Sequence, residues 1–229
     1  WKNAVDEPST ETQVVGSDVL KDYIHNIMEP ANAQRGDKIP VSAMLPYADG
    51  TIPQGTAAYE KRGTASDVPV WRPENCIQCN QCSLVCPHAA IRPFVLNEAE
   101  KQSAPESLET IKMLGKGCED KNFAIIISPM DCTGCGSCIN ACPAKTKALG
   151  FVSLDQAEGR QVNFNWAVSN VSEKETPFKA DTIKGSQFRT PLLEFSGACA
   201  GCGETPYAKL VTQLYGERMI IANATGCSS

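Results

Sequence analysis

Eight of the 12 cysteines lie in two short runs with the same internal spacing. The first run comprises Cys76, Cys79, Cys82 and Cys86, and the second comprises Cys132, Cys135, Cys138 and Cys142. A proline follows the last cysteine of each run. Thiolates are soft ligands for iron–sulfur clusters and zinc, and two-residue gaps let one tight loop direct three of them to one centre. The repeated spacing therefore predicts two metal–thiolate centres.

Disulfides and structural zinc are the competing interpretations of these cysteines. Dense C-x2-C spacing suits metal thiolates better than a disulfide scaffold. Structural zinc sites pair two separated C-x2-C knuckles, whereas here three cysteines share one loop. The run C-x2-C-x2-C-x3-C-P resembles that of bacterial ferredoxins, which bind two [4Fe–4S] clusters and in which the fourth cysteine of each run ligates the other cluster. This resemblance implies two ligand sets: Cys76, Cys79, Cys82 and Cys142 for cluster A, and Cys86, Cys132, Cys135 and Cys138 for cluster B.

The two loops differ in the residues between their cysteines. Gly134 and Gly136 in the second loop allow backbone N–H groups to approach cluster sulfurs, and such hydrogen bonds help set a reduction potential. The first loop has the bulkier Gln78, Asn80 and Gln81 instead. The sequence therefore predicts two clusters of different potential.

A third set of cysteines lies near the end of the chain, at Cys199, Cys202 and Cys227. Two interpretations stay open: a zinc knuckle or buried thiols, and a third cluster whose fourth ligand lies beyond Ser229. Cys118 has no partner at useful spacing, so we expect a free or half-buried thiol.

The two histidines lie outside any Ser–His–Asp arrangement. His25, on a predicted helix, is expected at the surface or in satisfied packing. His88 follows Cys86-Pro87, where it serves either packing or hydrogen bonding near cluster B.

Composition excludes several classes of protein. A chain of 229 residues has room for one large or two modest domains. The formal net charge of −5 and the absence of a Lys/Arg run argue against nucleic-acid binding. No apolar stretch approaches a membrane span, and we expect no signal peptide and a cytoplasmic, reducing location. The first residue is Trp1, and both ends are expected to be cut from a longer protein.

The patterning predicts strands at 68–71 and 90–96 around the first cysteine run, and at 123–128 and 148–154 around the second. We expect helices over 18–28, ended by Glu29-Pro30, over 106–114 within an insertion at 97–122, and over 163–171. Residues 190–195 are expected to be extended. Residues 204–215 are expected to form an amphipathic helix that ends at the C-cap Gly216, and its apolar side carries Tyr207, Leu210, Val211 and Leu214. A buried strand is expected at 219–222.

These elements predict an α+β fold. Residues 1–67 form an arm or linker that packs on neighbouring domains, and residues 68–154 form a ferredoxin-like, duplicated βαβ domain with two clusters. Residues 155–190 form a connecting segment. Residues 191–229 begin an α/β domain that the chain does not finish.

Several stretches together resemble one family, the single-chain pyruvate:ferredoxin (flavodoxin) oxidoreductases. They are GDKIPVS at 36–42, PQGT at 53–56, YEKR at 59–62, VPVW at 68–71, both cysteine runs, FSGACAGCGETPY at 195–207 and IANATGCSS at 221–229.

The resemblance implies part of an enzyme for CoA-dependent oxidative decarboxylation of pyruvate to acetyl-CoA and CO2. It implies thiamine diphosphate with Mg2+, and three [4Fe–4S] clusters that pass electrons to ferredoxin or flavodoxin. Cys199, Cys202 and Cys227 would hold the third cluster, and Glu204 and Cys227 would contact thiamine diphosphate in the domain that begins at residue 191. The Gly-Asp-Gly motif of the Mg2+ site and the pyruvate and CoA sites lie outside these residues. No catalytic residue is therefore assigned, the fragment alone is expected to be inactive, and the full-length enzyme is expected to be a homodimer.

The alternative function is a non-catalytic ferredoxin-type electron-transfer subunit of a multi-subunit oxidoreductase. Residues 195–229 discriminate between the two, because a simple electron carrier does not need them.

Overall fold

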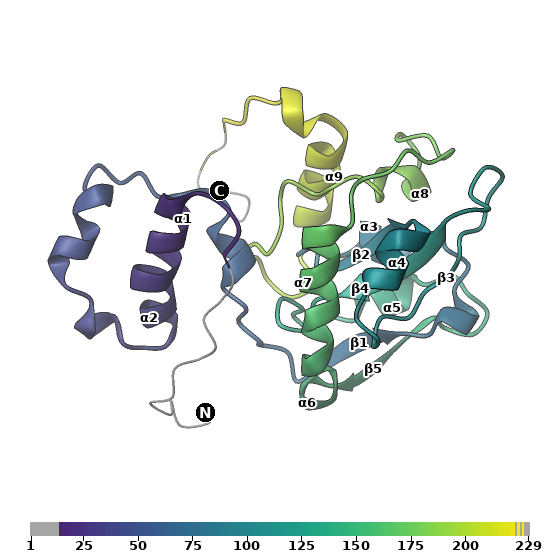
Figure 1. Cartoon of the computed structure of the whole chain (residues 1–229), viewed down its shortest axis with the longest axis horizontal. Helices are drawn as coiled ribbons and strands as arrows, with labels where there is room; N and C mark the ends of the chain where they lie inside the picture. The colour runs from purple at the N-terminus through teal and green to yellow at the C-terminus, as the bar shows by residue number, and fades with distance from the viewer. Residues whose placement is uncertain (1–13, 223, 225, 227–229) are drawn as a thin grey trace. The chain divides into compact units, whose positions relative to one another are not determined.

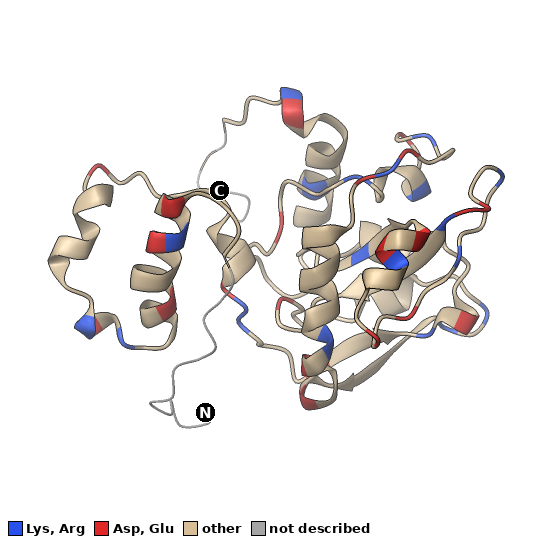
Figure 2. Ribbon diagram, viewed as in Figure 1, with Lys and Arg blue, Asp and Glu red and all other residues tan. Residues whose placement is uncertain are grey.

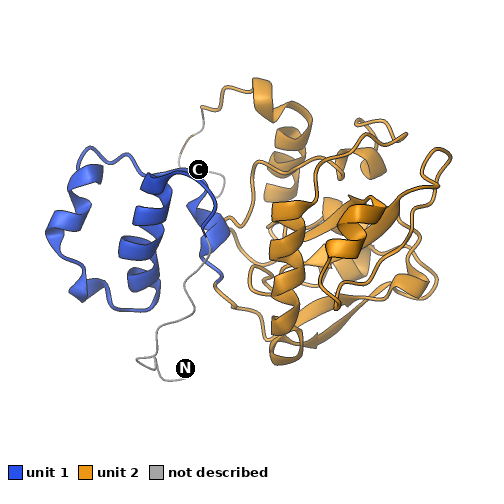
Figure 3. Ribbon diagram, viewed as in Figure 1, with its two compact units in different colours: residues 1–61 blue, residues 62–229 orange. Residues whose placement is uncertain are grey.

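The computed structural model describes residues 14–222, 224 and 226. The chain divides into two compact units, residues 1–61 and residues 62–229 (Figure 3). Each unit is described by itself below.

Unit 1 is built from short helical segments. Helix α1 (Asp18–Tyr23) continues through a π-helical turn (Ile24–Met28) into α2 (Glu29–Asn32), and 3-10 turns follow at Gly36–Lys38, Val41–Tyr47 and Thr56–Tyr59. Ile24, Ile27 and Tyr47 are buried, and the Tyr47 ring packs edge-on against Tyr23 with centroids 5.1 Å apart. The segment that the sequence predicts to be an arm thus has a small core of its own.

The predicted end of the first helix at Glu29-Pro30 is wrong, because the helix continues to Asn32. In the π-helical turn the N–H of Glu29 donates to the carbonyl of Ile24, five residues back. Pro30 therefore falls in the first turn of α2, where its missing N–H is tolerated. At the other end, Ser17 caps α1, because its hydroxyl accepts from the N–H of Leu20 at 3.2 Å.

Unit 2 contains two small antiparallel sheets (Figure 1). In the first sheet β1 (Asp67–Trp71) pairs with β5 (Leu149–Ser153). In the second sheet β2 (Ile91–Leu96) pairs with β4 (Asn122–Ile127), whose other edge carries β3 (Ile111–Lys112). The strands that flank the first cysteine run thus pair with the strands that flank the second. This interlocking confirms the predicted α+β arrangement of two duplicated halves.

Helices cover these sheets and link the cysteine loops. Helices α3 (Gln81–Leu84) and α5 (Ser137–Ala141) follow the two loops and pack on each other. The others are α4 (Glu98–Ser103), α6 (Leu154–Ala157), α7 (Gln161–Asn170), α8 (Ile183–Ser186) and α9 (Thr205–Tyr215), with 3-10 turns at Pro73–Asn75, Glu158–Arg160 and Gly216–Arg218. Helix α7, close to its predicted position, packs against β4 (Figure 1).

Aromatic side chains fill the core of unit 2. Phe123 on β4 is fully buried, and its ring contacts Trp71 on one side and Phe188 on the other, with centroids 6.1 and 6.3 Å apart. Both contacts are edge-on, the geometry that aromatic pairs prefer. The core therefore joins the second sheet to β1 and to the connecting segment. Among the described residues, no helix is both long and apolar enough to cross a lipid bilayer.

The predicted helix at 106–114 is wrong. The helix of the insertion is α4, which begins at Glu98, where Asn97 and Glu100 form a reciprocal capping box. Ile111 and Lys112, within the predicted helix, pair with β4 instead. The capping residues thus place the start of this helix nearer the beginning of the insertion than the apolar pattern predicts.

The buried strand expected at 219–222 is also wrong. Residues 219–222 are not a buried strand, since Ile220 is 98% exposed. Helix α9 forms as predicted and ends at Gly216, but Tyr207 and Val211 of its apolar side are exposed. Its buried residues are mostly polar: Thr205, Lys209, Thr212 and Gln213. An apolar helix face is usually the buried one. In α9 the polar face is buried instead, because its side chains find hydrogen-bond partners inside unit 2.

Candidate metal centres

The two cysteine loops share one backbone conformation. Gln78 and Asn80 in the first loop have φ of 56° and 61°, and Gly134 and Gly136 at the matching positions of the second have φ of 68° and 75°. This left-handed conformation suits glycine and strains most other residues. The duplication therefore extends to the local geometry that turns each chain around its cysteines.

Hydrogen bonds compensate for the strain in the first loop. The Gln78 amide donates to the carbonyl of Lys112 at 2.7 Å and accepts from the N–H of Leu114 at 2.7 Å. The Asn80 amide donates to the carbonyl of Lys184 at 2.9 Å. Both side chains are 1% exposed. The polar residues of this loop thus fasten the insertion and the connecting segment to the first cysteine run.

The second loop requires glycine for a steric reason. A Cβ on Gly134 would lie 2.9 Å from the carbonyl oxygen of Asp67 and 3.2 Å from the Cβ of Ala65. The N–H of Gly134 lies 3.4 Å from the sulfur of Cys132, so the expected approach of the backbone to a sulfur is present in this loop. Residues 65–67 therefore pack directly on the second cysteine run.

Each cysteine quartet lines a cavity of its own. Cavity A is lined by Cys76, Cys79, Cys82 and Cys142, together with Trp71 and Ile125. Cavity B is lined by Cys86, Cys132, Cys135 and Cys138, together with Ile91 and Ile127. Each quartet thus combines three cysteines of one run with the last cysteine of the other.

Burial controls the protonation of these thiols in the metal-free chain. The pKa of Cys132 and of Cys138 is raised to about 12, chiefly by burial. The neighbouring Cys86 contributes to both rises, and the backbone N–H groups of Gly134 and Ile139 act in the opposite direction on Cys132 and Cys138 respectively. Burial also raises the pKa of Cys82 well above its usual range, and Cys138 adds to this. Binding of iron to these sulfurs must displace their protons. Within the described residues, no group of three or more His, Cys, Asp or Glu side chains is arranged to hold a single metal ion.

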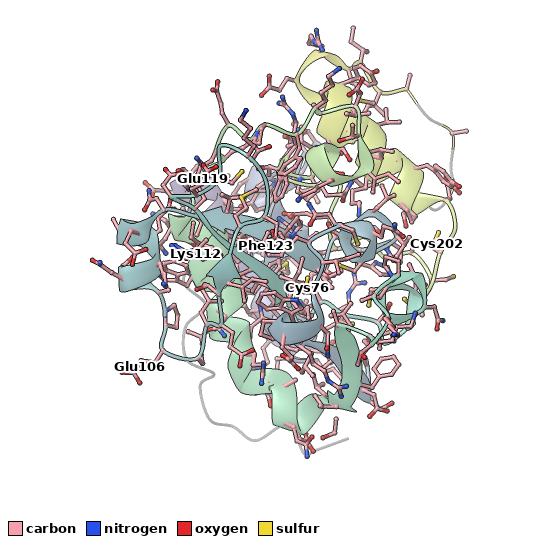
Figure 4. The ribbon with its side chains drawn as sticks, turned by 90° about the vertical axis from the view of Figure 1, so that its right-hand side faces the viewer. Cys76, Glu106, Lys112, Glu119, Phe123 and Cys202 are labelled. Atoms are coloured by element: carbon pink, nitrogen blue, oxygen red, sulfur yellow. The ribbon has the colours of Figure 1, made fainter. Side chains whose placement is uncertain are left out.

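The third cysteine set lies against the second loop. Cys199 is exposed and Cys202 precedes α9, at the edge of the unit in Figure 4. N–H groups of Thr205 and Glu204 lower the pKa of the Cys202 thiol. A Cβ on Gly201, between these cysteines, would lie 3.5 Å from the Cβ of Cys135. The structure thus brings two members of the predicted third set next to cavity B, while Cys227 lies outside the described residues.

His88 connects cavity B with the third set. Its side chain is 3% exposed and lines cavity B. Its Nδ1 lies 3.1 Å from the carbonyl oxygen of Ser196, and its Nε2 lies 3.3 Å from that of Cys199. Its own carbonyl accepts from the N–H of Phe195 at 2.9 Å. Of the two roles left open by the sequence, the structure therefore shows hydrogen bonding, and it is directed to the third cysteine set.

Lys209 on α9 is a residue that sequence reasoning missed. It is 1% exposed, and its ammonium group donates to the carbonyls of Ser83, of Leu84 at 3.2 Å and of Cys86 at 3.0 Å. Burial lowers its pKa to about 8. The one available signal was the polar stripe that Lys209 shares with Thr205 and Thr212 on α9.

Exposed lysines lie on chain segments that adjoin the cysteines of cavity A. Ile77, between Cys76 and Cys79, is 53% exposed. Lys112, Lys145 and Lys147 are exposed, and Lys147 donates to the carbonyl of Cys142 at 2.6 Å. The formal net charge of the chain is nevertheless −5, with acidic residues spread over both units (Figure 2).

The remaining cysteine and histidine agree with expectation. Cys118 is a fully buried free thiol. His25 is half-buried, with its Nδ1 3.0 Å from a carboxylate oxygen of Glu29. Glu204, predicted to contact thiamine diphosphate, is exposed at the residue before α9.

Comparison with known proteins first defines the class of the cysteine-rich part. Residues 75–146 match a family model described as a 4Fe-4S dicluster domain. Residues 9–65 match a model described as a domain of unknown function, and this match coincides closely with unit 1.

The whole chain is similar to one segment of much longer proteins. It is 53% identical over 225 residues to a pyruvate-flavodoxin oxidoreductase of Klebsiella pneumoniae, covering 98% of this chain and 19% of the relative. It is 54% identical over 231 residues to a pyruvate:ferredoxin oxidoreductase of Moorella thermoacetica, covering 100% and 19%. It is 47% identical over 237 residues to a pyruvate dehydrogenase [NADP(+)] of Cryptosporidium parvum, covering 99% and 12%. The chain thus spans about a fifth of the length of the first two relatives, and the resemblance inferred from its sequence is confirmed.

Proposed function

We propose that the chain is the electron-relay part of an enzyme for the CoA-dependent oxidative decarboxylation of pyruvate to acetyl-CoA and CO2. Electrons would pass through three [4Fe–4S] clusters to ferredoxin or flavodoxin. The observation that carries the proposal is the pair of cavities, each lined by a quartet of cysteines drawn from both runs. The names of the relatives support the substrate and the acceptors.

The ligand sets follow from the two cavities. Cys76, Cys79, Cys82 and Cys142 would hold cluster A, and Cys86, Cys132, Cys135 and Cys138 would hold cluster B. Each bound cluster supplies a site that takes up and releases one electron. The apolar lining and the shared loop conformation fit a buried cubane, and backbone N–H groups such as that of Gly134 would donate to its sulfurs.

The third set would hold the cluster that receives electrons first, through Cys199, Cys202, Cys227 and a cysteine outside this chain. The contact of Gly201 with Cys135, and the bonds from His88 to the segment of Cys199, support transfer from this cluster to cluster B. Cys82 and Cys138 influence each other electrostatically across the packed α3 and α5, which supports onward transfer to cluster A. The order third cluster, cluster B, cluster A therefore fits the packing.

Thiamine diphosphate would bind where residues 191–229 begin the next domain, in contact with Glu204 and Cys227. The exposed position of Glu204 leaves its carboxylate accessible to a ligand. The Mg2+ site and the pyruvate and CoA sites would lie in other parts of the enzyme. We assign residues 68–154 to the two-cluster domain, 1–67 to packing on neighbouring domains and 155–190 to the connection.

The acceptor would dock over cavity A. Exposed Ile77 offers an apolar contact, and Lys112, Lys145 and Lys147 offer positive charge for an acidic carrier such as ferredoxin or flavodoxin. Complementary charge at a rim speeds association and orients the partner. The enzyme would be a cytoplasmic homodimer.

Anaerobic assay of the intact enzyme tests the proposal. We expect flavodoxin or ferredoxin reduction that requires both pyruvate and CoA, with iron and sulfide contents that match three [4Fe–4S] clusters per chain. Cys199→Ser should leave thiamine diphosphate bound, measured by calorimetry, and stop acceptor reduction. Clusters that accept electrons from dithionite but never from pyruvate would support the non-catalytic electron-transfer subunit instead.

A further inference from the structure

Lys209 places a positive charge in the interior, beside the chain that leads from one cluster site to the other. Its three acceptors are the backbone carbonyls of Ser83, Leu84 and Cys86, where α3 ends. Cys82 on this stretch belongs to cavity A and Cys86 belongs to cavity B. The ammonium group is thus held in a fixed place by the backbone that presents both cysteines.

The surroundings of Lys209 offer cysteine sulfurs, not carboxylates, to balance its charge. After burial, the side chains that act on its pKa are Cys86, Arg92 and Cys82, in that order. Arg92 is itself paired with Glu194. Within the described residues, no carboxylate forms an ion pair with Lys209. A buried charge is costly unless it is paired, so the sulfur ligands are the natural counter-charge.

Neutral groups already join α9 to α3. The hydroxyl of Ser83 donates to the Gln187 amide at 2.9 Å, and that amide donates to Gln213 on α9 at 3.1 Å. Gln213 in turn donates to the carbonyl of Arg189 at 2.9 Å. Attachment of the helix therefore does not by itself require a cation at position 209.

We propose that Lys209 is a positioning residue that supplies the counter-charge of cluster B and raises its reduction potential, a role that rests on the ligand sets proposed above. Uptake of one electron at the Cys86 site adds one negative charge, and a fixed ammonium nearby stabilises that charge in a poorly screened interior. We expect a smaller effect on cluster A, because Lys209 bonds to the carbonyl of its cluster B ligand Cys86 and its other acceptors are Ser83 and Leu84, not the cluster A ligand Cys82. Lys209 would thereby favour electron transfer onto cluster B from the third cluster.

Redox titration followed by EPR, on the intact protein purified without oxygen, tests this role. We expect Lys209→Met to shift the midpoint potential of cluster B to a more negative value, with a smaller shift for cluster A. Lys209→Arg keeps the charge and should stay near the wild-type potential. The matched control is Lys101→Met, which removes an exposed lysine on α4 and should shift neither potential.

Iron and sulfide contents, measured on each variant, separate the outcomes. An unchanged potential of cluster B in Lys209→Met with full iron content would overturn the proposal. If Lys209→Met loses its clusters, Lys209→Gln keeps a donor for the carbonyls without the charge, and equal potentials in Lys209→Gln and Lys209→Arg would overturn it as well. Wild-type protein without [4Fe–4S] signals would instead refute the proposed function.

Discussion

The imidazole Nε2 of His88 lies 3.3 Å from the carbonyl oxygen of Cys199, 111 residues further along the chain. The other ring nitrogen bonds to Ser196, and the ring lines the cavity of the second cysteine quartet. A neutral ring donates to only one of these carbonyls, whereas a protonated ring donates to both. In either state one buried side chain ties the third cysteine set to cluster site B.

Replacing His88 should therefore loosen the third cysteine set. His88→Ala removes the donor to one of these two part-buried carbonyls, or to both when the ring is protonated, and such a loss costs roughly 1–3 kcal/mol. We expect a lower Tm and slower transfer of electrons to cluster B in freeze-quench EPR. His25→Ala is the matched control, because His25 is half-buried and bonds only within its own helical segment. Equal losses of Tm in both variants would contradict a special role for His88.

Replacing Gly134 should lower the stability of the fold more than replacing Gly117. Both have positive φ, so alanine at either costs about 1 kcal/mol in backbone strain. Only at Gly134 does the new Cβ meet a backbone oxygen, that of Asp67, whereas nothing lies within 4 Å at Gly117. We expect Gly134→Ala to lower Tm further than Gly117→Ala and to speed the loss of iron to a chelator. A larger effect at Gly117 would show that the contact with Asp67 relaxes at no cost.

Glu100 should make the stability of the insertion depend on pH. Burial raises its pKa, but hydrogen bonds from Lys174 at 2.7 Å, from the Asn97 N–H and from the Ser172 N–H outweigh burial, so that the pKa is lowered. A carboxyl with a lowered folded-state pKa stabilises the fold above its unfolded-state pKa, and this contribution disappears as the pH falls through the folded-state pKa.

Thermal unfolding across this acid range measures the effect. Glu100→Gln should lower Tm at neutral pH, and the difference from wild type should shrink as the pH falls. Glu106→Gln, which alters an exposed carboxylate of the same insertion (Figure 4), should leave Tm unchanged at every pH. A constant difference for Glu100→Gln would mean that the carboxylate charge contributes nothing.

The parts of the fold that follow local rules could be predicted from the sequence. The strands around Cys76 and Cys132 carry apolar runs of strand length, and the repeated spacing of the cysteines indicates the duplication. The fold of unit 1 was harder to predict from the sequence, because its Gly- and Pro-rich segment has little periodicity. Its core depends on contacts between residues far apart in the chain, such as that of Tyr47 with Tyr23.

Residues whose partners are distant in sequence could not be predicted. Lys209 bonds to Ser83, 126 residues away, and no local pattern distinguishes a lysine that finds buried carbonyls from one that is solvated. The exposure of the apolar side of α9 could not be predicted for a similar reason. Hydrophobic periodicity shows which face of a helix is apolar, but it does not show which face other parts of the protein cover. In the first loop Gln78 is bulky for a left-handed position, and only its bonds to Lys112 and Leu114 explain it.

Exchange of the fourth cysteine between the runs gives the sharpest test of the cluster assignments. Cys86 lines the cavity of the second run and Cys142 lines the cavity of the first. Cys86→Ser should therefore give the EPR spectrum of Cys132→Ser, because both remove a ligand of cluster B. Cys142→Ser should give that of Cys76→Ser. Because serine nearly preserves side-chain volume, any differences would come from ligation and not from packing. If Cys86→Ser instead matched Cys82→Ser, each run would hold its own cluster and the two halves would not be cross-linked.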